Sequence, residues 1–130
     1  MLLTPINPPS AAWPGVSQGM ILKGNGIFVS TGHVGVDEQG NVIDASLEDQ
    51  VVALFESLGR TLKAASLGFE HVARMTTYVT DFESETVDTI RRVRSRYFNA
   101  DAPPASVMIG VAALYDPRLR VEAEIIAVVP

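Results

Sequence analysis

The sequence predicts an α+β domain in which two helices cover one face of a β-sheet. Two segments carry apolar residues at spacings of three and four, as amphipathic helices do. The shorter apolar segments around them alternate or end in turn residues, as strands do. The order strand–strand–(strand)–helix–strand–helix–strand–strand is most economically packed with both helices on one side of the sheet. The length of 130 residues fits one domain, residues 1–130.

The first third of the chain predicts short extended elements. Four prolines within residues 1–14 predict an extended, irregular start. Residues 20–23 and 27–31 are predicted to be strands, joined as a hairpin by Gly-Asn-Gly at 24–26. Residues 35–41 predict a further turn, and a short third strand can precede it.

The first helix has a clear start signal. Ser46 is a suitable N-cap, and Asp49 follows three residues later, as in a capping box. Gly68 is placed to end the helix in a left-handed conformation. A strand is predicted over residues 72–80. The apolar stripe of the helix consists of Leu47, Val51, Leu54, Phe55, Leu58, Leu62 and Ala65.

The second helix is predicted over residues 84–98, and two strands follow it at 106–113 and 119–129. Pro103 and Pro104 separate the helix from these strands. Residues 125–129 are apolar on both faces of the last strand. This pattern predicts that the uncovered sheet face is buried against another subunit.

Composition excludes several classes of protein. Apolar residues make up 47% and charged residues 19%, which excludes intrinsic disorder. The chain has no cysteine, so it has no disulfide or thiolate site, and its two histidines nearly exclude a multi-histidine metal site within one subunit. The net charge of −5 argues against nucleic acid as a partner. Without a signal peptide or an apolar run of membrane-spanning length, we expect a cytoplasmic protein with no membrane partner.

Two glutamates are the first candidates for chemistry. Glu122 and Glu124 are two residues apart on the last predicted strand, so their side chains share one face, and Arg120 precedes them on it. Neighbouring carboxylates are a common device for general acid–base catalysis. A solvated strand face with a cross-strand ion pair is the alternative.

Basic side chains are the second group of candidates. Four arginines at 91, 92, 94 and 96 form either an anion site or the solvated face of a helix; Arg91 and Arg94 are the better candidates because they flank the packed stripe. His33 follows Thr31 and Gly32 at a strand end, where ligands often bind, although a lone histidine is more often structural.

Four motifs, in order along nearly the whole chain, resemble those of the RidA (YjgF/YER/UK) family of small imine and enamine deaminases. The motifs are residues 14–19 (PGVSQG), 29–33 (VSTGH), 104–114 (PASVMIGVAAL) and 121–127 (VEAEIIA). The resemblance implies a fold like that of the bacillary chorismate mutase, a homotrimer, and three ligand clefts at the subunit junctions. It also implies a small-molecule metabolite as ligand, with neither metal nor cofactor.

The resemblance also assigns roles to individual residues. Glu122 matches the glutamate that holds the attacking water, and Glu124 matches the next glutamate of the motif. Thr31, Gly32 and His33 match the strand end beside the cleft, with His33 in place of a glutamine.

Three further positions of the implied cleft depart from the family pattern. Ser106 stands where the deaminases have an arginine that binds the substrate carboxylate through two contacts, which a serine cannot reproduce. Val16 stands where the family often has a tyrosine, and Arg91 where it often has an asparagine. We therefore expect a divergent member with a different or weaker ligand preference.

Three functions follow as alternatives. The first is a metal-independent hydrolytic deaminase of a small reactive imine or enamine, with Glu122 positioning water in an inter-subunit cleft. The second is a non-catalytic trimer that binds a small metabolite. The third, an RNA-cleaving or translation-inhibiting activity, is disfavoured by the acidic net charge.

Overall fold

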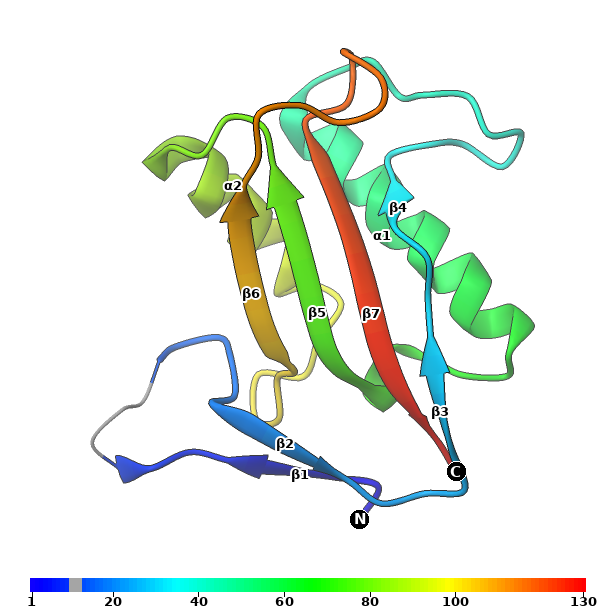
Figure 1. The fold of residues 1–130 in the computed structure, drawn as a ribbon, viewed down its shortest axis with the longest axis vertical. Helices are drawn as coiled ribbons and strands as arrows, with labels where there is room; N and C mark the ends of the chain where they lie inside the picture. Colours follow the sequence, from blue (N-terminus) through cyan, green and yellow to red (C-terminus); the bar gives the residue numbers. More distant parts are fainter. Residues whose placement is uncertain (10–12) are drawn as a thin grey trace.

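The computed structural model describes residues 1–9 and 13–130, and it has the predicted α+β architecture (Figure 1). The strands form a two-stranded and a five-stranded sheet. The strands are β1 (Leu3–Ile6), β2 (Gly19–Leu22), β3 (Gly26–Val29), β4 (His33–Val34), β5 (Val72–Val79), β6 (Ala105–Gly110) and β7 (Val121–Val129). The helices are α1 (Leu47–Ala64), the short 3₁₀ helix η2 (Phe69–His71) and α2 (Ser84–Arg94).

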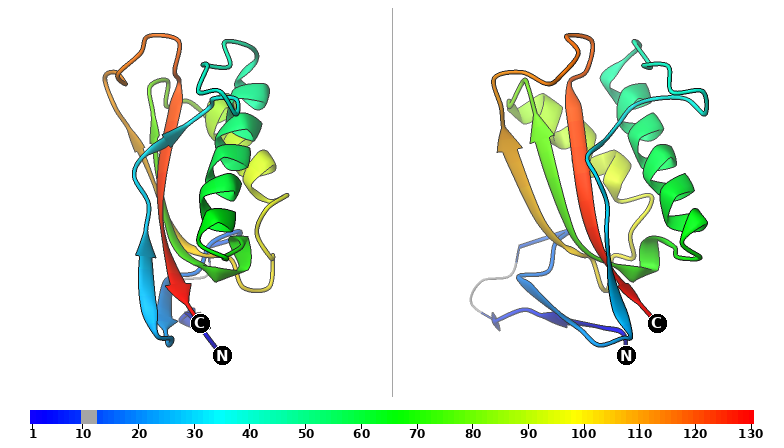
Figure 2. Two further views of the ribbon diagram at one scale, coloured as in Figure 1. Left: turned by 90° about the vertical axis from the view of Figure 1, so that its right-hand side faces the viewer. Right: turned by 45° about the vertical axis from the view of Figure 1, so that its right-hand side comes forward.

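The five-stranded sheet is mixed, and the long strand β7 organises it. Its order is β3-β7-β5-β6, and β4 pairs with β7 beyond the end of β3. β7 is antiparallel to β3, β4 and β5, whereas β5 and β6 are parallel and α2 connects them. Both helices lie on one face of this sheet and the other face carries no helix, as the edge-on view in Figure 2 shows. The prediction of two helices on one face is confirmed.

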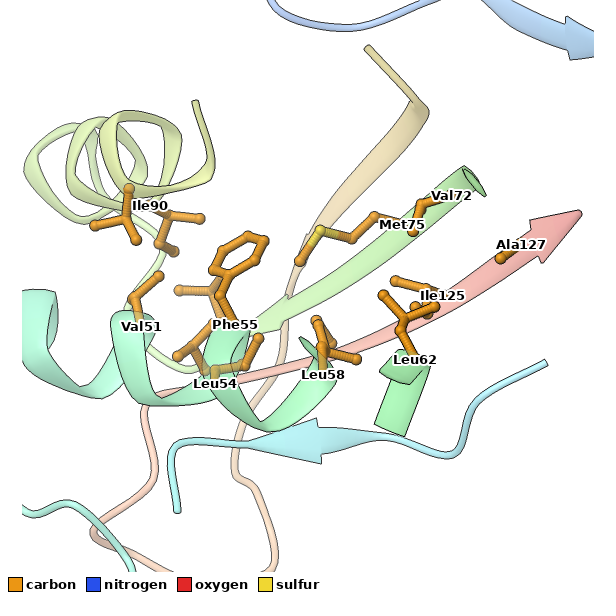
Figure 3. Close-up of a cluster of buried hydrophobic side chains, with 14 of the residues drawn as sticks. Val51, Leu54, Phe55, Leu58, Leu62, Val72, Met75, Ile90, Ile125 and Ala127 are labelled. Carbon is orange, nitrogen blue, oxygen red and sulfur yellow. The ribbon is translucent and has the colours of Figure 1, made fainter. Parts of the chain in front are cut away.

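The core lies between α1, α2 and the covered face of the sheet (Figure 3). Alternate residues of β7 point into it, because side chains of a strand alternate between its two faces. The residues between them, Glu122, Glu124 and Ile126, are only partly buried and lie on the uncovered face. The centre of the core is formed by Leu54, Phe55, Leu58, Leu62, Met75, Ile90 and Ile125.

The ends of α1 show one correct and one wrong prediction. The Ser46 hydroxyl accepts a hydrogen bond from the Asp49 amide at 3.1 Å, as expected for an N-cap. The helix ends before Gly68, because Ser66 adopts the left-handed conformation with φ of 58°. The Leu67 amide then donates to the Leu62 carbonyl at 2.9 Å, and buried Leu67 joins the core. This is a Schellman termination with serine in the usual glycine position.

The predicted hairpin over residues 20–31 is wrong. β2 pairs with β1, and β3 pairs with β7, so the segment between them crosses from one sheet to the other. Neither Gly24 nor Gly26 has a positive φ. Gly24 is instead needed for close approach, since a Cβ there would lie 2.7 Å from Val128 Cγ2.

The irregular start also contains a strand, β1, in which Pro5 occupies an edge position where proline is tolerated.

Several helices and strands are shorter than predicted. α2 ends at Arg94, and the turns after it still bring Tyr97 into stacking contact with Phe55, at 4.6 Å between ring centroids. β6 ends at Gly110 and β7 begins at Val121. No helix among the described residues is both long and apolar enough to span a membrane.

Candidate functional site

Glu122 and Glu124 lie side by side on the uncovered face of the sheet. Tyr78 is the cross-strand partner of Glu122, and Thr76 is that of Glu124. The Tyr78 hydroxyl donates a hydrogen bond to Glu124 Oε1 at 2.5 Å. The pKa of Tyr78 is raised above its usual value, first by this hydrogen bond, then by burial of the hydroxyl and by the negative charges of Glu124 and Glu122. Glu124 is therefore engaged by Tyr78, whereas no described residue pairs with the Glu122 carboxylate.

Gly32 leaves the space that the Glu122 carboxylate occupies. A Cβ on Gly32 would lie 2.8 Å from Glu122 Oε2 and 2.9 Å from Cδ, which no side chain tolerates without displacing the carboxylate. Ser30 fixes this segment against β7, because its hydroxyl accepts from the Ile125 amide at 2.9 Å and donates to the Thr31 carbonyl at 2.8 Å. Thr31 and Gly32 are thus held beside Glu122.

His33 faces away from Glu122. It is in register with Ala123, which points into the core, so its ring lies on the helix-covered face. Its Nδ1 lies 2.9 Å from the Thr31 carbonyl and therefore donates to it, and its Nε2 accepts from the Thr61 hydroxyl at 2.7 Å. His33 therefore links the Thr31 backbone to Thr61 of α1 and does not point toward Glu122.

A second group of predicted residues lines a cavity of about 380 Å³ at the edge strand β6. Val16, Arg91 and Ser106 all contribute to it. The N-terminal segment forms one wall and is fastened to the start of β6 by Ser17, whose hydroxyl donates to the Pro103 carbonyl at 2.5 Å. The other lining residues are Trp13, Pro14, Ser17, Gln18, Arg74, Arg94, Ala105, Val107 and Met108.

Arg94 is the main feature of this cavity. Arg94 is only 7% exposed, and its Nη1 donates to the Ser106 hydroxyl at 3.2 Å. Burial and the nearby charge of Arg91 lower the pKa of Arg94. Sequence analysis grouped Arg94 with Arg91 because both flank the packed stripe of the helix, but nothing in the sequence pattern pointed to Arg74.

The other members of the arginine cluster form ordinary surface ion pairs. Arg92 and Arg96 contact Glu48 of α1 at 2.7 and 3.2 Å. Arg120, expected beside Glu122, donates instead to the Ala45 carbonyl at 2.5 Å. Among residues 1–9 and 13–130, no three histidine or acidic side chains converge as a metal site would require.

Glu122 and Ser106 lie on opposite faces of the sheet. Ser106 is in register with core residue Met75 and meets Arg94 from α2, so it faces the helices. Glu122 is in register with Tyr78 on the uncovered face, three residues further along β5, or about 10 Å. One chain therefore carries two separate half-sites, a carboxylate half at Glu122 and Gly32 and a basic half at Ser106 and Arg94.

Comparison with known proteins agrees with this fold. Residues 8–129 match the family model described as Endoribonuclease L-PSP. The chain belongs to this family, which is the RidA (YjgF) family. The match spans nearly the whole chain and includes all four motifs on which the resemblance was based.

Individual relatives of this RidA-family chain are moderately similar in sequence. A RutC family protein of Aquifex aeolicus is 27% identical over 124 residues, which cover 95% of this chain and 97% of the relative. The 2-iminobutanoate/2-iminopropanoate deaminase of Mus musculus is 34% identical over 104 residues, covering 78% and 73% of the two chains. The solved structure of the Rid family protein YyfB of Yersinia pestis superposes with a TM-score of 0.89 at 27% identity and covers 99% of this chain and all of its own.

Proposed function

We propose that this chain is a hydrolytic deaminase of a small reactive imine or enamine, and that Glu122 positions the attacking water in a cleft between subunits. The observation that carries the proposal is the Glu122 carboxylate, which lies unpaired against Gly32 on the uncovered sheet face. The relationship to the mouse 2-iminobutanoate/2-iminopropanoate deaminase supports the same chemistry.

The proposed reaction needs one carboxylate and one water. Glu122 accepts a proton from the water as the water oxygen bonds to the imine carbon. The electron pair of the C=N bond moves to nitrogen, which takes that proton from Glu122. Glu122 then accepts the proton of the new hydroxyl as the C=O bond forms and passes it to the amine nitrogen as the C–N bond breaks, so that a carbonyl compound and ammonia leave. Both protons pass through Glu122, which acts in turn as base and as acid and ends as the carboxylate.

The uncovered sheet face supports assembly as a homotrimer. Ile27 and Val29 of β3 are 65% and 67% exposed and lie beside Ile126 and Val128 of β7 on that face. Apolar strand surface of this kind marks a contact with another protein. A neighbouring copy over this face would bring the basic half-site of one subunit to the carboxylate half-site of another, which a single chain cannot do.

The test is release of ammonia and carbonyl product from 2-imino acids made in situ by an amino-acid oxidase. Glu122→Gln should lower turnover by about 10²- to 10⁴-fold, the usual contribution of a general acid–base group, without changing the assembly. Glu38→Gln, the same change at an exposed residue of a distant turn, is the matched control. Full activity of Glu122→Gln would remove Glu122 from the mechanism.

Ser106 favours a second candidate function, a trimer that binds a small metabolite without converting it. An arginine fork holds a carboxylate through two parallel hydrogen bonds, and Ser106 offers one hydroxyl that Arg94 already occupies. Calorimetric binding of small acids together with no detectable hydrolysis of any imine would support this candidate over the deaminase.

A further inference from the structure

Among the described residues, the lining of the cavity at β6 carries three arginines and no acidic side chain. Arg74, Arg91 and Arg94 come from β5 and α2 and line the same hollow. Within the described part of the chain, none of the three forms an ion pair, although other arginines, such as Arg92 and Arg118, do. The lining residues include no acidic side chain. The three residues outside the described part, 10–12, are Ser-Ala-Ala and supply none.

This concentration of charge is unusual for the chain as a whole. The protein carries 15 acidic and 10 basic residues, yet the described lining of this cavity has three arginines and no acidic side chain. Arginine is almost never fully buried unless it is paired, because removing an unpaired charge from water is costly. Arg94 is 93% buried, and its one side-chain hydrogen bond among the described residues goes to a neutral serine.

The three arginines lie at two depths of the cavity, one at its base and two at its rim. Arg94 lies buried at the base, where it holds the Ser106 hydroxyl. Arg91 is exposed and reaches the rim from α2, whereas exposed Arg74 reaches it from the uncovered face of β5, where it is in register with Ala105, so the cavity extends around the edge strand β6. Ser106 is short, so the space that a longer side chain on β6 would fill remains part of the cavity. Two separated acidic groups could therefore be held at once, one at the base and one at the rim.

We propose that Arg94, Arg91 and Arg74 form a binding site for a small organic dianion. One acidic group binds the Arg94 guanidinium and the Ser106 hydroxyl, and the second lies between Arg91 and Arg74. If the chain is the proposed deaminase, the site also defines its substrate class: the favoured imine carries two acidic groups, not one. This part of the inference rests on the proposed function. Binding itself requires no turnover and can be measured whether or not hydrolysis occurs.

Trp13 provides the measurement. It is the only tryptophan of the chain and it lines this cavity, so its fluorescence reports occupancy. The probes are succinate, butyrate and inorganic phosphate, titrated at constant ionic strength near pH 7.5. Succinate and butyrate have equal carbon number and differ by one carboxylate. We expect succinate to bind at least about tenfold more tightly than butyrate, since a second charge-assisted contact is worth that much.

The phosphate titration identifies the kind of dianion. Tighter binding of succinate than of phosphate supports a site for two separated acidic groups, and the reverse order would overturn it in favour of a site for one phosphate group. Butyrate binding as tightly as both dianions, or no binding of any probe, would overturn the proposal. Imine hydrolysis assayed in parallel is a separate outcome, because a bound dianion without turnover contradicts only the deaminase.

Variants of the arginines complete the test. Arg94→Met should weaken succinate binding by about 10- to 100-fold, the loss of one charge-assisted contact. Arg92→Gln, which removes the same charge from the outer face of the same helix, should bind succinate as the wild type does. Because Arg94 is buried, Arg91→Gln serves as a second variant at an exposed position and should weaken succinate more than butyrate. Wild-type affinity in both Arg91→Gln and a folded Arg94→Met would exclude the site.

Discussion

At the scale of single residues, Gly32 controls where the Glu122 carboxylate can lie. The glycine is required by proximity, not by an unusual backbone angle, because only a Cβ is excluded by Glu122 Oε2. Gly32→Ala should therefore displace the carboxylate, the flexible partner, while the backbone stays in place. We expect turnover to fall by at least about tenfold, because a misplaced catalytic group loses its alignment, with little change in melting temperature.

Gly26→Ala is the control for this variant. A Cβ at Gly26 would meet Val129 at an ordinary 3.7 Å, so the same substitution changes one strand without disturbing Glu122. Imine hydrolysis and thermal unfolding of both variants decide the question. If Gly32→Ala keeps wild-type turnover, or loses it only by unfolding, the space beside Glu122 has no catalytic role.

The sequence predicted which residues are candidates for the site better than it predicted what those residues contact. The spacing of Glu122 and Glu124 placed both on one face, and the structure agrees. The side on which His33 lies could not be inferred, because it depends on the register of the two-residue strand β4 with β7. The lack of an ion pair at Arg94 is also a tertiary property, since Arg92 and Arg96, on the same stretch of sequence, are paired with Glu48 of α1.

At the scale of elements, buried Gln50 of α1 fastens two loops to the helix. Its Nε2 donates to the carbonyls of Ile43 and Arg118 at 3.1 and 3.0 Å, and its Oε1 accepts from the Arg120 amide at 2.7 Å. These loops lead into α1 and into β7, the strand that carries Glu122. Gln50→Leu would leave three backbone groups without partners in the interior.

We expect Gln50→Leu to lower the free energy of unfolding by about 2–4 kcal/mol, since each unpaired buried group costs about 1–3 kcal/mol and some will reach water. The measurement is the urea midpoint of the folded protein. Gln39→Leu, in an exposed turn, should change it by less than about 0.5 kcal/mol. A stability equal to wild type would mean that the loops re-form these hydrogen bonds elsewhere.

Periodic elements were predicted well, and elements defined by pairing were not. α1, β5 and β7 carry their own patterns of three-and-four or alternating apolar residues, which follow from the geometry of helix and strand. The hairpin failed because glycine is compatible with both a turn and a close approach, and Gly24 serves the second purpose. β1 was missed because Pro5 reads locally as irregular, although its strand needs only β2 as a partner.

At the scale of the whole molecule, the positions of the two half-sites determine how copies of the chain would have to be arranged to form the proposed cleft. Glu122 faces away from the helices and Ser106 faces toward them, so the proposed cleft would have to join Glu122 of one copy to Ser106 and Arg94 of another. The sequence predicted the uncovered apolar face from residues 125–129 but could not show that the half-sites are on opposite sides. That relation depends on the register of β6 with β5, which no local pattern fixes.

The proposal that two subunits share each cleft makes a prediction that single variants cannot test. Glu122→Gln and Arg94→Met each disable one half-site, so each homotrimer should be inactive. If the two variants are unfolded together, mixed in equal amounts and refolded, some clefts receive an intact Glu122 from one chain and an intact Arg94 from the other. Random assembly restores about a quarter of the clefts, and turnover should recover to about that fraction of wild type.

The controls for this mixing experiment are the variants refolded separately, and the native mass of each sample. The mass should be about three times the 14.0 kDa of one chain.

Val29→Asp, which places a charge on the uncovered sheet face, should give a monomer with no turnover, because burying an unpaired charge in an interface costs several kcal/mol. Ile21→Asp adds the same charge to an exposed residue of the smaller sheet and should leave the trimer intact. No recovery in the mixed sample, at the mass of a trimer, would show that each cleft draws both half-sites from one chain. Turnover by the separately refolded Arg94→Met trimer would show that Arg94 is not needed.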